Sequence, residues 1–320
     1  MTALHQETPV SSPARKARGP VRADRAGRGP ATRGRGRGGA RAFLYLAPAL
    51  LFYGAFVIVP WLHTVELSFY HWDGITPGVW AGLENYRTVL TDPQLLGSIR
   101  NAFGFVGFYT VLPIAAGLVL AAVIGRAKGS HAISRTVLFL PQIIPLVAVG
   151  VVWRGMYGTD GTVNQVLDAV GLGSWSRAWL GDFDWAYVAV GLVGSWVMLG
   201  LCLVLFQSGI QKIDPSLYEA ARLDGAGAVR EFFAVTLPGL RSEISVAVTV
   251  TVIAALASFD VVFVTTGGGP GETTTVPGVL IYRLAFTSGQ VGTACALAVV
   301  LSTLISLVVL AVNRLTRERA

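Results

Sequence analysis

The stretch Trp185-Ala-Tyr-Val-Ala-Val-Gly-Leu-Val-Gly-Ser-Trp-Val-Met-Leu-Gly-Leu-Cys-Leu-Val-Leu-Phe-Gln-Ser-Gly-Ile210 contains no charged residue. An α-helix rises 1.5 Å per residue, so about 20 residues cross the hydrocarbon core of a bilayer. Hydrocarbon offers no partner to backbone N–H and C=O groups, and a helix satisfies them internally. The stretch therefore predicts a transmembrane helix.

Five other apolar runs have a similar length, and only the run from 244 to 264 contains a charge, Asp260. The whole chain of 320 residues is 53% hydrophobic and only 13% charged, whereas soluble domains have about 25% charged residues. A transmembrane barrel would show alternating segments of about ten residues instead. The sequence predicts an all-α polytopic membrane protein with six transmembrane helices. The five further runs are Ala42 to Leu62, Ala102 to Gly125, Thr136 to Trp153, Ile244 to Val264 and Val291 to Asn313.

The net charge of +7 comes from the N-terminal tail, residues 1–41, which holds ten Lys or Arg and two acidic residues. This tail is rich in Pro, Gly, Ala and Arg, so we expect it to be disordered. Its Arg/Gly run lacks the aromatic residues that stack on bases, which favours a solvated tail over a nucleic-acid partner. The first apolar run is longer than the core of a signal peptide, so we expect it to remain in the mature protein.

The distribution of basic residues predicts the orientation of the chain. With the N-terminus in the cytoplasm, 20 of the 25 Lys and Arg residues lie on the inner side. This asymmetry follows the positive-inside rule and places both termini in the cytoplasm. Pro141 and Pro145 fall within the third run, where proline favours a kink. The outer basic residues are Arg87, Arg100, Arg154, Arg177 and Arg283.

The connection between the fourth and fifth runs carries signals for a short helix outside the membrane. Asp214 can cap the helix, Pro215 suits its first position, and Gly225 suits the residue after its end. These signals predict a helix of about ten residues. A second short helix is expected around Val229 to Val235, before the fifth run begins.

The same connection resembles the permeases of binding-protein-dependent ABC importers, which carry Glu-Ala-Ala, then Asp-Gly-Ala, and later Leu-Pro. The resemblance implies the type I importer transmembrane-domain fold, with residues 214–226 as the coupling helix that docks on a cytoplasmic ATPase dimer. It also implies that Glu219 pairs with a basic residue of the ATPase. The residues that match in order and spacing are Glu219, Ala220, Ala221, Asp224, Gly225, Ala226, Leu237 and Pro238.

Further residues resemble the carbohydrate and glycerol-3-phosphate branch of these permeases. The branch implies import of a sugar or related polyol by alternating access in a bacterial cell membrane. Its other implied partners are an extracytoplasmic solute-binding protein and a second permease subunit, a diverged homologue. The residues that carry this resemblance are Gly82, Leu83, Asn85, Tyr86, Asp92, Pro93 and Asn101, then Thr265 to Pro270, Tyr282, Ala285 and Phe286.

The sequence contains no sign of an ATP site, a metal site or an active site. The glycine run from Gly267 to Gly271 is not followed by Lys-Ser/Thr, as a phosphate-binding loop requires. Cys202 and Cys295 have no nearby His or Cys partner, so we expect two small core residues. No His-Glu-x-x-His motif occurs. We therefore expect a transport subunit without its own cofactor, with ATP and Mg²⁺ bound by the partner ATPase.

Asp260, Gln142 and Trp196 are the candidates for the solute pathway. A carboxylate in hydrocarbon costs about 2.5–3.5 kcal/mol on insertion scales, so it usually faces a cavity or a partner. We expect Asp260 near the outer boundary, packed against the glycine-rich loop, and direct contact with the solute is the alternative. Gln142 and Trp196 are the other inward-facing candidates.

The predicted organisation is a tail (1–41), a first span with an extracytoplasmic loop (42–100), a core permease domain (101–313) and a cytoplasmic end (314–320). The rival hypothesis is an ion-coupled secondary transporter of a small polar solute. Such a protein should show paired internal repeats with broken, charge-bearing helices. No repeat is visible in the sequence, and this hypothesis leaves the connection between the fourth and fifth runs unexplained.

Overall fold

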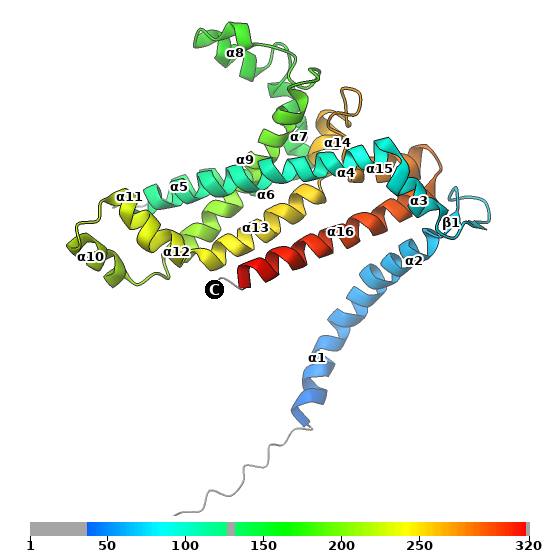
Figure 1. Ribbon diagram of the computed structural model, residues 1–320, viewed down its shortest axis with the longest axis horizontal. Helices are drawn as coiled ribbons and strands as arrows, with labels where there is room; N and C mark the ends of the chain where they lie inside the picture. The colour runs from blue at the N-terminus through cyan, green and yellow to red at the C-terminus, as the bar shows by residue number, and fades with distance from the viewer. Residues whose placement is uncertain (1–36, 127–131, 318–320) are drawn as a thin grey trace, which may run out of the picture. The chain divides into compact units, whose positions relative to one another are not determined.

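The computed structural model describes residues 37–126 and 132–317, and these residues are mostly helical (Figure 1). The chain divides into two compact units, Met1–Gly54 and Ala55–Ala320. The predicted disorder of residues 1–36 lies outside the described residues.

In the first unit, helix α1 (Arg37–Tyr53) begins before the predicted start at Ala42. Residues 37–41, which composition assigned to the tail, thus form the first turn of α1. The apolar side chains of α1 are largely exposed, among them Tyr45 and Leu51.

In the described part of the second unit, the regular elements are helices apart from one two-stranded antiparallel hairpin, in which Tyr70 pairs with Trp80. The prediction of an all-α chain missed this hairpin, because strands of two residues are too short to show alternation. After the π-helical turn η1 (Gly54–Ile58), the elements are α2 (Val59–Leu67), β1 (Tyr70–His71), β2 (Val79–Trp80), α3 (Glu84–Thr91), α4 (Pro93–Val106), η2 (Gly107–Val111), α5 (Leu112–Arg126), α6 (Ala132–Ile143), α7 (Leu146–Met156), α8 (Thr162–Ala169), η3 (Gly173–Trp175), α9 (Ala186–Ile210), α10 (Pro215–Leu223), α11 (Ala228–Glu231), η4 (Phe232–Thr236), α12 (Leu237–Gly239), α13 (Arg241–Leu256), α14 (Asp260–Thr265), α15 (Pro277–Tyr282), η5 (Arg283–Thr287) and α16 (Val291–Arg317).

Helix α9 lies at the centre of the second unit and contacts α5, α6, η2 and α13. Two of its glycines permit this close packing. A Cβ atom on Gly194 would lie 2.0 Å from the ring of Tyr109, and one on Gly191 would lie 2.5 Å from the ring of Phe108. Ser195 of α9 also donates a hydrogen bond to the Phe108 carbonyl (2.8 Å). Figure 1 shows α4, α13 and α16 running beside one another next to this centre.

Among the described residues, four helices are long and apolar enough to cross a membrane, and a fifth candidate is a bent pair, Ala228–Gly239 with Arg241–Leu256. The predicted count of six is therefore not confirmed by helix length. The pair bends by 70° between Gly239 and Arg241. The four long helices are Tyr45–Leu67, Pro93–Val123, Ala186–Ile210 and Val291–Leu315.

The predicted third and fifth spans are each divided in two. In the third, α6 continues through Pro141 and ends at Ile143, and α7 starts after Pro145. Proline has no N–H and disfavours helical geometry at the preceding residue, which explains the break at Ile144. In the fifth, α13 ends at Leu256 and α14 starts at Asp260.

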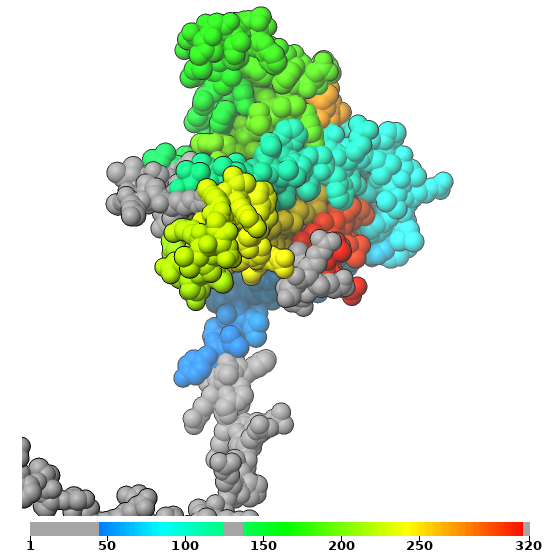
Figure 2. Space-filling view, turned by 60° about the vertical axis from the view of Figure 1, so that its left-hand side comes forward, coloured from blue at the N-terminus to red at the C-terminus, as the bar shows by residue number. Residues whose placement is uncertain are grey.

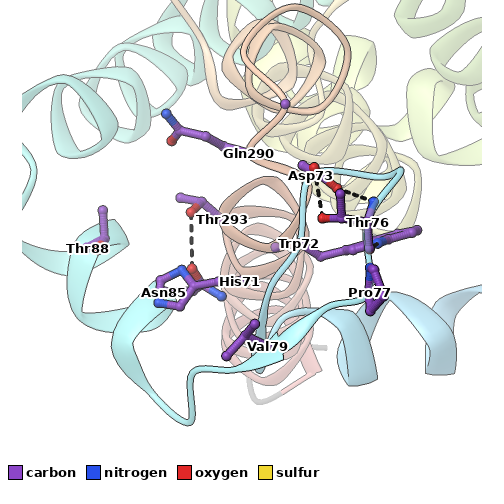
Figure 3. Close-up of a pocket in the computed structure, with 12 residues that line it drawn as sticks. His71, Trp72, Asp73, Thr76, Pro77, Val79, Asn85, Thr88, Gln290 and Thr293 are labelled. Atoms are coloured by element: carbon purple, nitrogen blue, oxygen red, sulfur yellow. Dashed lines mark hydrogen bonds between the residues drawn. The ribbon is translucent and has the colours of Figure 1, made fainter.

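Asn85 joins three elements at the end of the unit that carries the hairpin (Figure 3). Its side chain is buried, and Nδ2 donates to the Ser68 and Tyr70 carbonyls (2.9 Å each). Its Oδ1 accepts from Thr293 Oγ1 (3.1 Å) at the start of α16. A polar groove of about 450 Å³ lies here, between the hairpin loop and α16. Asn85 thus fixes the relative positions of α3, the hairpin and α16.

We expect the Asn85→Ala substitution to destabilise the protein by about 2–3 kcal/mol, because two buried carbonyl groups lose their donor. The measurement is thermal unfolding of the purified chain in detergent. Gln165→Ala is the matched control, since the exposed Gln165 donates one bond to the Asp160 carbonyl (2.9 Å). Equal unfolding temperatures for both variants would contradict the assigned role of Asn85.

Candidate functional site

Helix α10 has the capping that its sequence predicts. The Asp214 side chain accepts a hydrogen bond from the Ser216 backbone N–H (2.9 Å), and this bond lowers the pKa of Asp214. Pro215 occupies the first helical position, and Gly225 follows the C-cap with a φ of +77°. Only glycine adopts such a φ at little cost. Helix α10 is thus a well-defined helix of nine residues.

The surface of α10 is open along its whole length, since none of its residues is buried. Leu223 is 89% exposed and Leu217 is 53% exposed. Glu219 and Ala220 are exposed as well, and Ala221 is half-buried. Figure 2 shows this end of the molecule, with the yellow-green surface of α10 and the following helices in front. The matched motif therefore lies on a surface that a partner can reach.

Two side-chain contacts join α10 to the helices that follow it. Arg222 Nε lies 3.2 Å from Glu231 Oε2, and Tyr218 Oη lies 3.2 Å from Thr236 Oγ1. Glu231 belongs to α11 and Thr236 ends η4, in agreement with the second short helix that the sequence predicts. The sequence did not predict either contact, because the paired residues lie on different helices and their contact depends on the direction of the chain after Gly225.

The motif residues are not all in one place. Glu219, Ala220 and Ala221 lie on α10, and Asp224, Gly225 and Ala226 form its C-terminal turn. The Ala226 N–H donates to the Ala221 carbonyl (2.9 Å), which closes this turn. Leu237 and Pro238 form α12, next to the 70° bend before α13. The structure thus connects an exposed helix to a candidate membrane span through a short helical segment.

A small cavity of about 180 Å³ lies beside Asp260. Most of its wall is apolar and comes from α9 and the end of α13. Its polar lining residues are Tyr109, Ser258 and Asp260. Ser258 is 8% exposed, and its hydroxyl has no hydrogen-bond partner among the described residues. A buried hydroxyl without a partner is unfavourable, so a polar group bound here would be stabilised.

Of the three predicted pathway residues, the structure places only Asp260 on the wall of this cavity. Trp196 packs edge-on against Trp153 of α7, with 5.5 Å between ring centroids. Gln142 lies in α6, and its buried Oε1 has no partner in the described part of the chain. Tyr109 and Ser258 were missed, because single hydroxyl residues within apolar runs are common.

The glycine-rich loop after α14 is held by several polar contacts. Arg283 pairs with Glu272 (3.2 Å) and donates to the Gly267 carbonyl, and the Glu272 carboxylate accepts from Thr275. Asn101 Nδ2 donates to the Thr275 carbonyl (2.9 Å). The residues that line the cavity beside Asp260 come from other segments and not from this loop.

Within residues 37–126 and 132–317, no group of three or more His, Cys, Asp or Glu side chains could hold a metal ion. Both cysteines are free thiols. Cys202 is buried in a cluster with Leu203 and Phe206, as expected of a core residue, and Cys295 is half-buried.

The model of the binding-protein-dependent transport system inner membrane component family matches residues 113–319. The chain therefore belongs to this family. It is the permease subunit of a binding-protein-dependent ABC importer, a multi-pass membrane protein that transports and is not an enzyme.

Curated relatives cover most of the chain. The probable ABC transporter permease protein YurN of Bacillus subtilis is 37% identical over 262 residues, which are 81% of this chain and 89% of YurN. The diacetylchitobiose uptake system permease protein NgcF of Streptomyces coelicolor is 32% identical, over 85% of this chain and 82% of NgcF. The lactose transport system permease protein LacF of Rhizobium radiobacter is 31% identical, over 76% and 83%.

The fold is similar to that of a chain in the crystal structure of a bacterial ABC transporter that imports the acidic polysaccharide alginate. The TM-score is 0.75 at 22% sequence identity, and the match covers 87% of this chain and 96% of that chain. A second structure shows the alginate transporter with a periplasmic protein bound to an alginate pentasaccharide, again with a TM-score of 0.75. These similarities establish the architecture of an ABC importer permease.

Proposed function

We propose that this permease imports a sugar or a related polyol by alternating access, driven by a separate ATPase dimer that docks on α10. The observation that carries the proposal is the capped helix α10, none of whose residues is buried, with Glu219 exposed on it. Relatives that transport diacetylchitobiose and lactose support the class of solute. ATP and Mg²⁺ would bind to the ATPase, since this chain supplies only the surface on which the ATPase acts.

The proposed topology has six spans with both termini in the cytoplasm. In this topology α6 with α7 forms the third span and α13 with α14 forms the fifth, so each broken helix pair crosses once. Broken helices are tolerated in a membrane where they are buried in protein or line a cavity, and α14 borders such a cavity. The location of 20 of the 25 Lys and Arg residues supports the orientation, with α10 inside and the hairpin outside.

The proposed solute pathway passes the cavity beside Asp260. A sugar hydroxyl could donate to the Asp260 carboxylate and accept from the buried Ser258 hydroxyl, and Tyr109 adds a third polar contact. Gln142 and Trp196 stay secondary candidates on neighbouring helices. The remaining walls of the pathway would come from a second permease subunit, a diverged homologue, and an extracytoplasmic binding protein would deliver the solute.

Reconstitution tests the proposal. The chain is incorporated into liposomes with its partner permease, its ATPase and its solute-binding protein, and uptake of radiolabelled mono- and disaccharides is measured. We expect uptake that requires both ATP and the binding protein. Uptake driven by a proton or sodium gradient without ATP would refute the proposal and support a secondary transporter.

We expect the Asp260→Ala variant to raise the solute concentration for half-maximal uptake by about tenfold or more, since a hydrogen bond to a charged group contributes about 1.5–3 kcal/mol. Binding of the ATPase should not change, because Asp260 is remote in sequence from α10 and lines a different site. Asp160→Ala is the matched control at an exposed carboxylate. Unchanged half-saturation in Asp260→Ala would exclude this cavity from the pathway.

A further inference from the structure

Helix α10 is followed by a segment with little resistance to rotation. Residues 224–227 read Asp-Gly-Ala-Gly, and Gly225 has a positive φ. Glycine restricts the backbone least, so these residues would let α10 swivel relative to α11 if nothing else joined them. If α10 could rotate freely, a protein that docks on it and displaces it would move α10 alone and not the helices that follow.

Two side chains one helical turn apart cross this segment. Tyr218 and Arg222 are four residues apart and therefore lie on one face of α10. They contact Thr236 and Glu231, which belong to the continuous helical segment from Ala228 to Gly239. Two contacts that are spaced along a helix restrict its rotation, which a single contact does not.

The acidic partner in this arrangement is buried and the basic partner is exposed. The Glu231 side chain is 6% exposed, whereas that of Arg222 is 63% exposed. A buried carboxylate requires a charged or hydrogen-bonding partner, so Glu231 favours the position of Arg222 that pairs with it. The carboxylate also raises the pKa of Arg222. The pair therefore holds Arg222, and with it α10, against α11.

The inner end of α13 is held by residues that precede α10. Lys212, just before α10, pairs with Glu243 in the first turn of α13 (2.9 Å), and the Glu243 side chain is 12% exposed. A Cβ atom on Gly209 would lie 2.4 Å from Leu240, which is fully buried at the bend. At its other end, α13 supplies Ile253 to the cavity beside Asp260. The segment from α11 to α12 leads directly into α13 at Leu240, so α13 connects this segment to the cavity beside Asp260.

We propose that Tyr218 and Arg222 form a two-point latch that makes α10 and the segment from α11 to α12 move as one body with the inner end of α13. The latch consists of the Tyr218–Thr236 and Arg222–Glu231 contacts. These are positioning residues that convert docking of the ATPase into displacement of α13. The inference rests on the proposed function, in which α10 receives the ATPase.

The test uses the complete reconstituted importer and measures solute taken up per ATP hydrolysed. Arg222→Met removes the charge and keeps most of the side chain, and Tyr218→Phe removes only a hydroxyl. We expect the Arg222→Met variant to bind its ATPase and hydrolyse ATP at nearly the normal rate, with uptake per ATP reduced about tenfold. Arg222→Lys, which retains a donor and a charge, should restore most of the coupling. Arg230→Met is the matched control, an exposed arginine of the same segment outside the latch.

Normal uptake per ATP in both Arg222→Met and Tyr218→Phe would overturn the latch. If Arg222→Met fails to fold, the Tyr218→Phe variant provides the test. Uptake per ATP reduced at least twofold in Tyr218→Phe supports the latch, and a normal value overturns it. A role confined to stability would lower the amount of folded importer without changing the uptake per ATP of the remainder. Failure of the proposed function has a different result, because ATP-driven uptake would then survive disruption of α10 at Glu219.

Discussion

The Glu219→Lys variant is expected to reach the membrane in normal amounts and to lose ATP-driven uptake. Glu219 is exposed on α10 and adds only the smallest of the electrostatic contributions at Arg222, so we expect the fold to tolerate the change of charge. If it faces a basic residue of the ATPase, the substitution places two positive charges together. Changing one partner of a buried interfacial charge pair costs about 2–5 kcal/mol, which is roughly 30-fold or more in affinity.

Two assays separate insertion from coupling in this variant. Membrane abundance is measured by quantitative immunoblotting, and uptake is measured in the reconstituted complex. Glu66→Lys is the matched control, because Glu66 has the same charge, is 62% exposed and lies near the hairpin, far along the chain from α10. Undiminished uptake by Glu219→Lys would remove Glu219 from the docking surface.

A second large effect is expected at the packing of α9 against η2. An alanine at Gly194 would place its Cβ 2.0 Å from the Tyr109 ring, well inside van der Waals contact. Alanine is favoured over glycine in a helix by about 1 kcal/mol. Overpacking a core usually destabilises a protein by about 1–3 kcal/mol, and by more where the neighbouring backbone segments cannot move apart. The clash with Tyr109 therefore outweighs the gain in helix propensity. We expect Gly194→Ala to unfold at a lower temperature, and Gly194→Leu to yield little folded protein.

The matched control for Gly194 is Gly155→Ala in α7. A Cβ atom on Gly155 would meet nothing within 4 Å, so this variant keeps the gain in helix propensity without the clash. The measurement is thermal unfolding in detergent, with size-exclusion chromatography to determine the folded fraction. A Gly194→Ala protein as stable as Gly155→Ala would show that α9 and η2 are not in tight contact.

The helix ends of α10 could be predicted because they depend on nearest neighbours alone. Asp214, Pro215 and Gly225 each act within one turn of their own position, and the structure shows each in the expected role. The long uninterrupted helix α9 was also predictable, since its composition excludes any other location than hydrocarbon or a protein interior.

The division of the fifth run could not be predicted, because its composition stays apolar through the break. Ala257 to Phe259 interrupt the helix where α15 approaches: a Cβ atom on Gly278 would lie 3.0 Å from the Ser258 carbonyl and 3.1 Å from Phe259. Phe259 also stacks on Phe263, with 5.0 Å between ring centroids. The approach of Gly278 joins residues about 20 positions apart, and a window of local sequence does not contain it.

The lining of the cavity beside Asp260 and the Arg222–Glu231 pair were missed for a related reason. Tyr109 and Asp260 line one cavity although η2 and α14 are far apart in sequence. The Arg222–Glu231 pair depends on the direction of the chain after Gly225. Residue type identified Asp260 as unusual in an apolar run, but only the fold shows which hydroxyl groups accompany it.

If the solute passes the cavity beside Asp260, as proposed, the size of this cavity limits what the permease can admit. Its volume of about 180 Å³ is below the ~300–1,000 Å³ of pockets that enclose drug-sized ligands. A solute with two sugar rings would not fit unless the wall of the cavity moved outward. The short helix α14 is separated from α13 by a break in the helix, so it is the part of the wall that we expect to move. On the proposed pathway, the part of the wall that this chain supplies would therefore have to move for larger solutes, and a graded series of linear oligosaccharides would reveal the length at which passage stops.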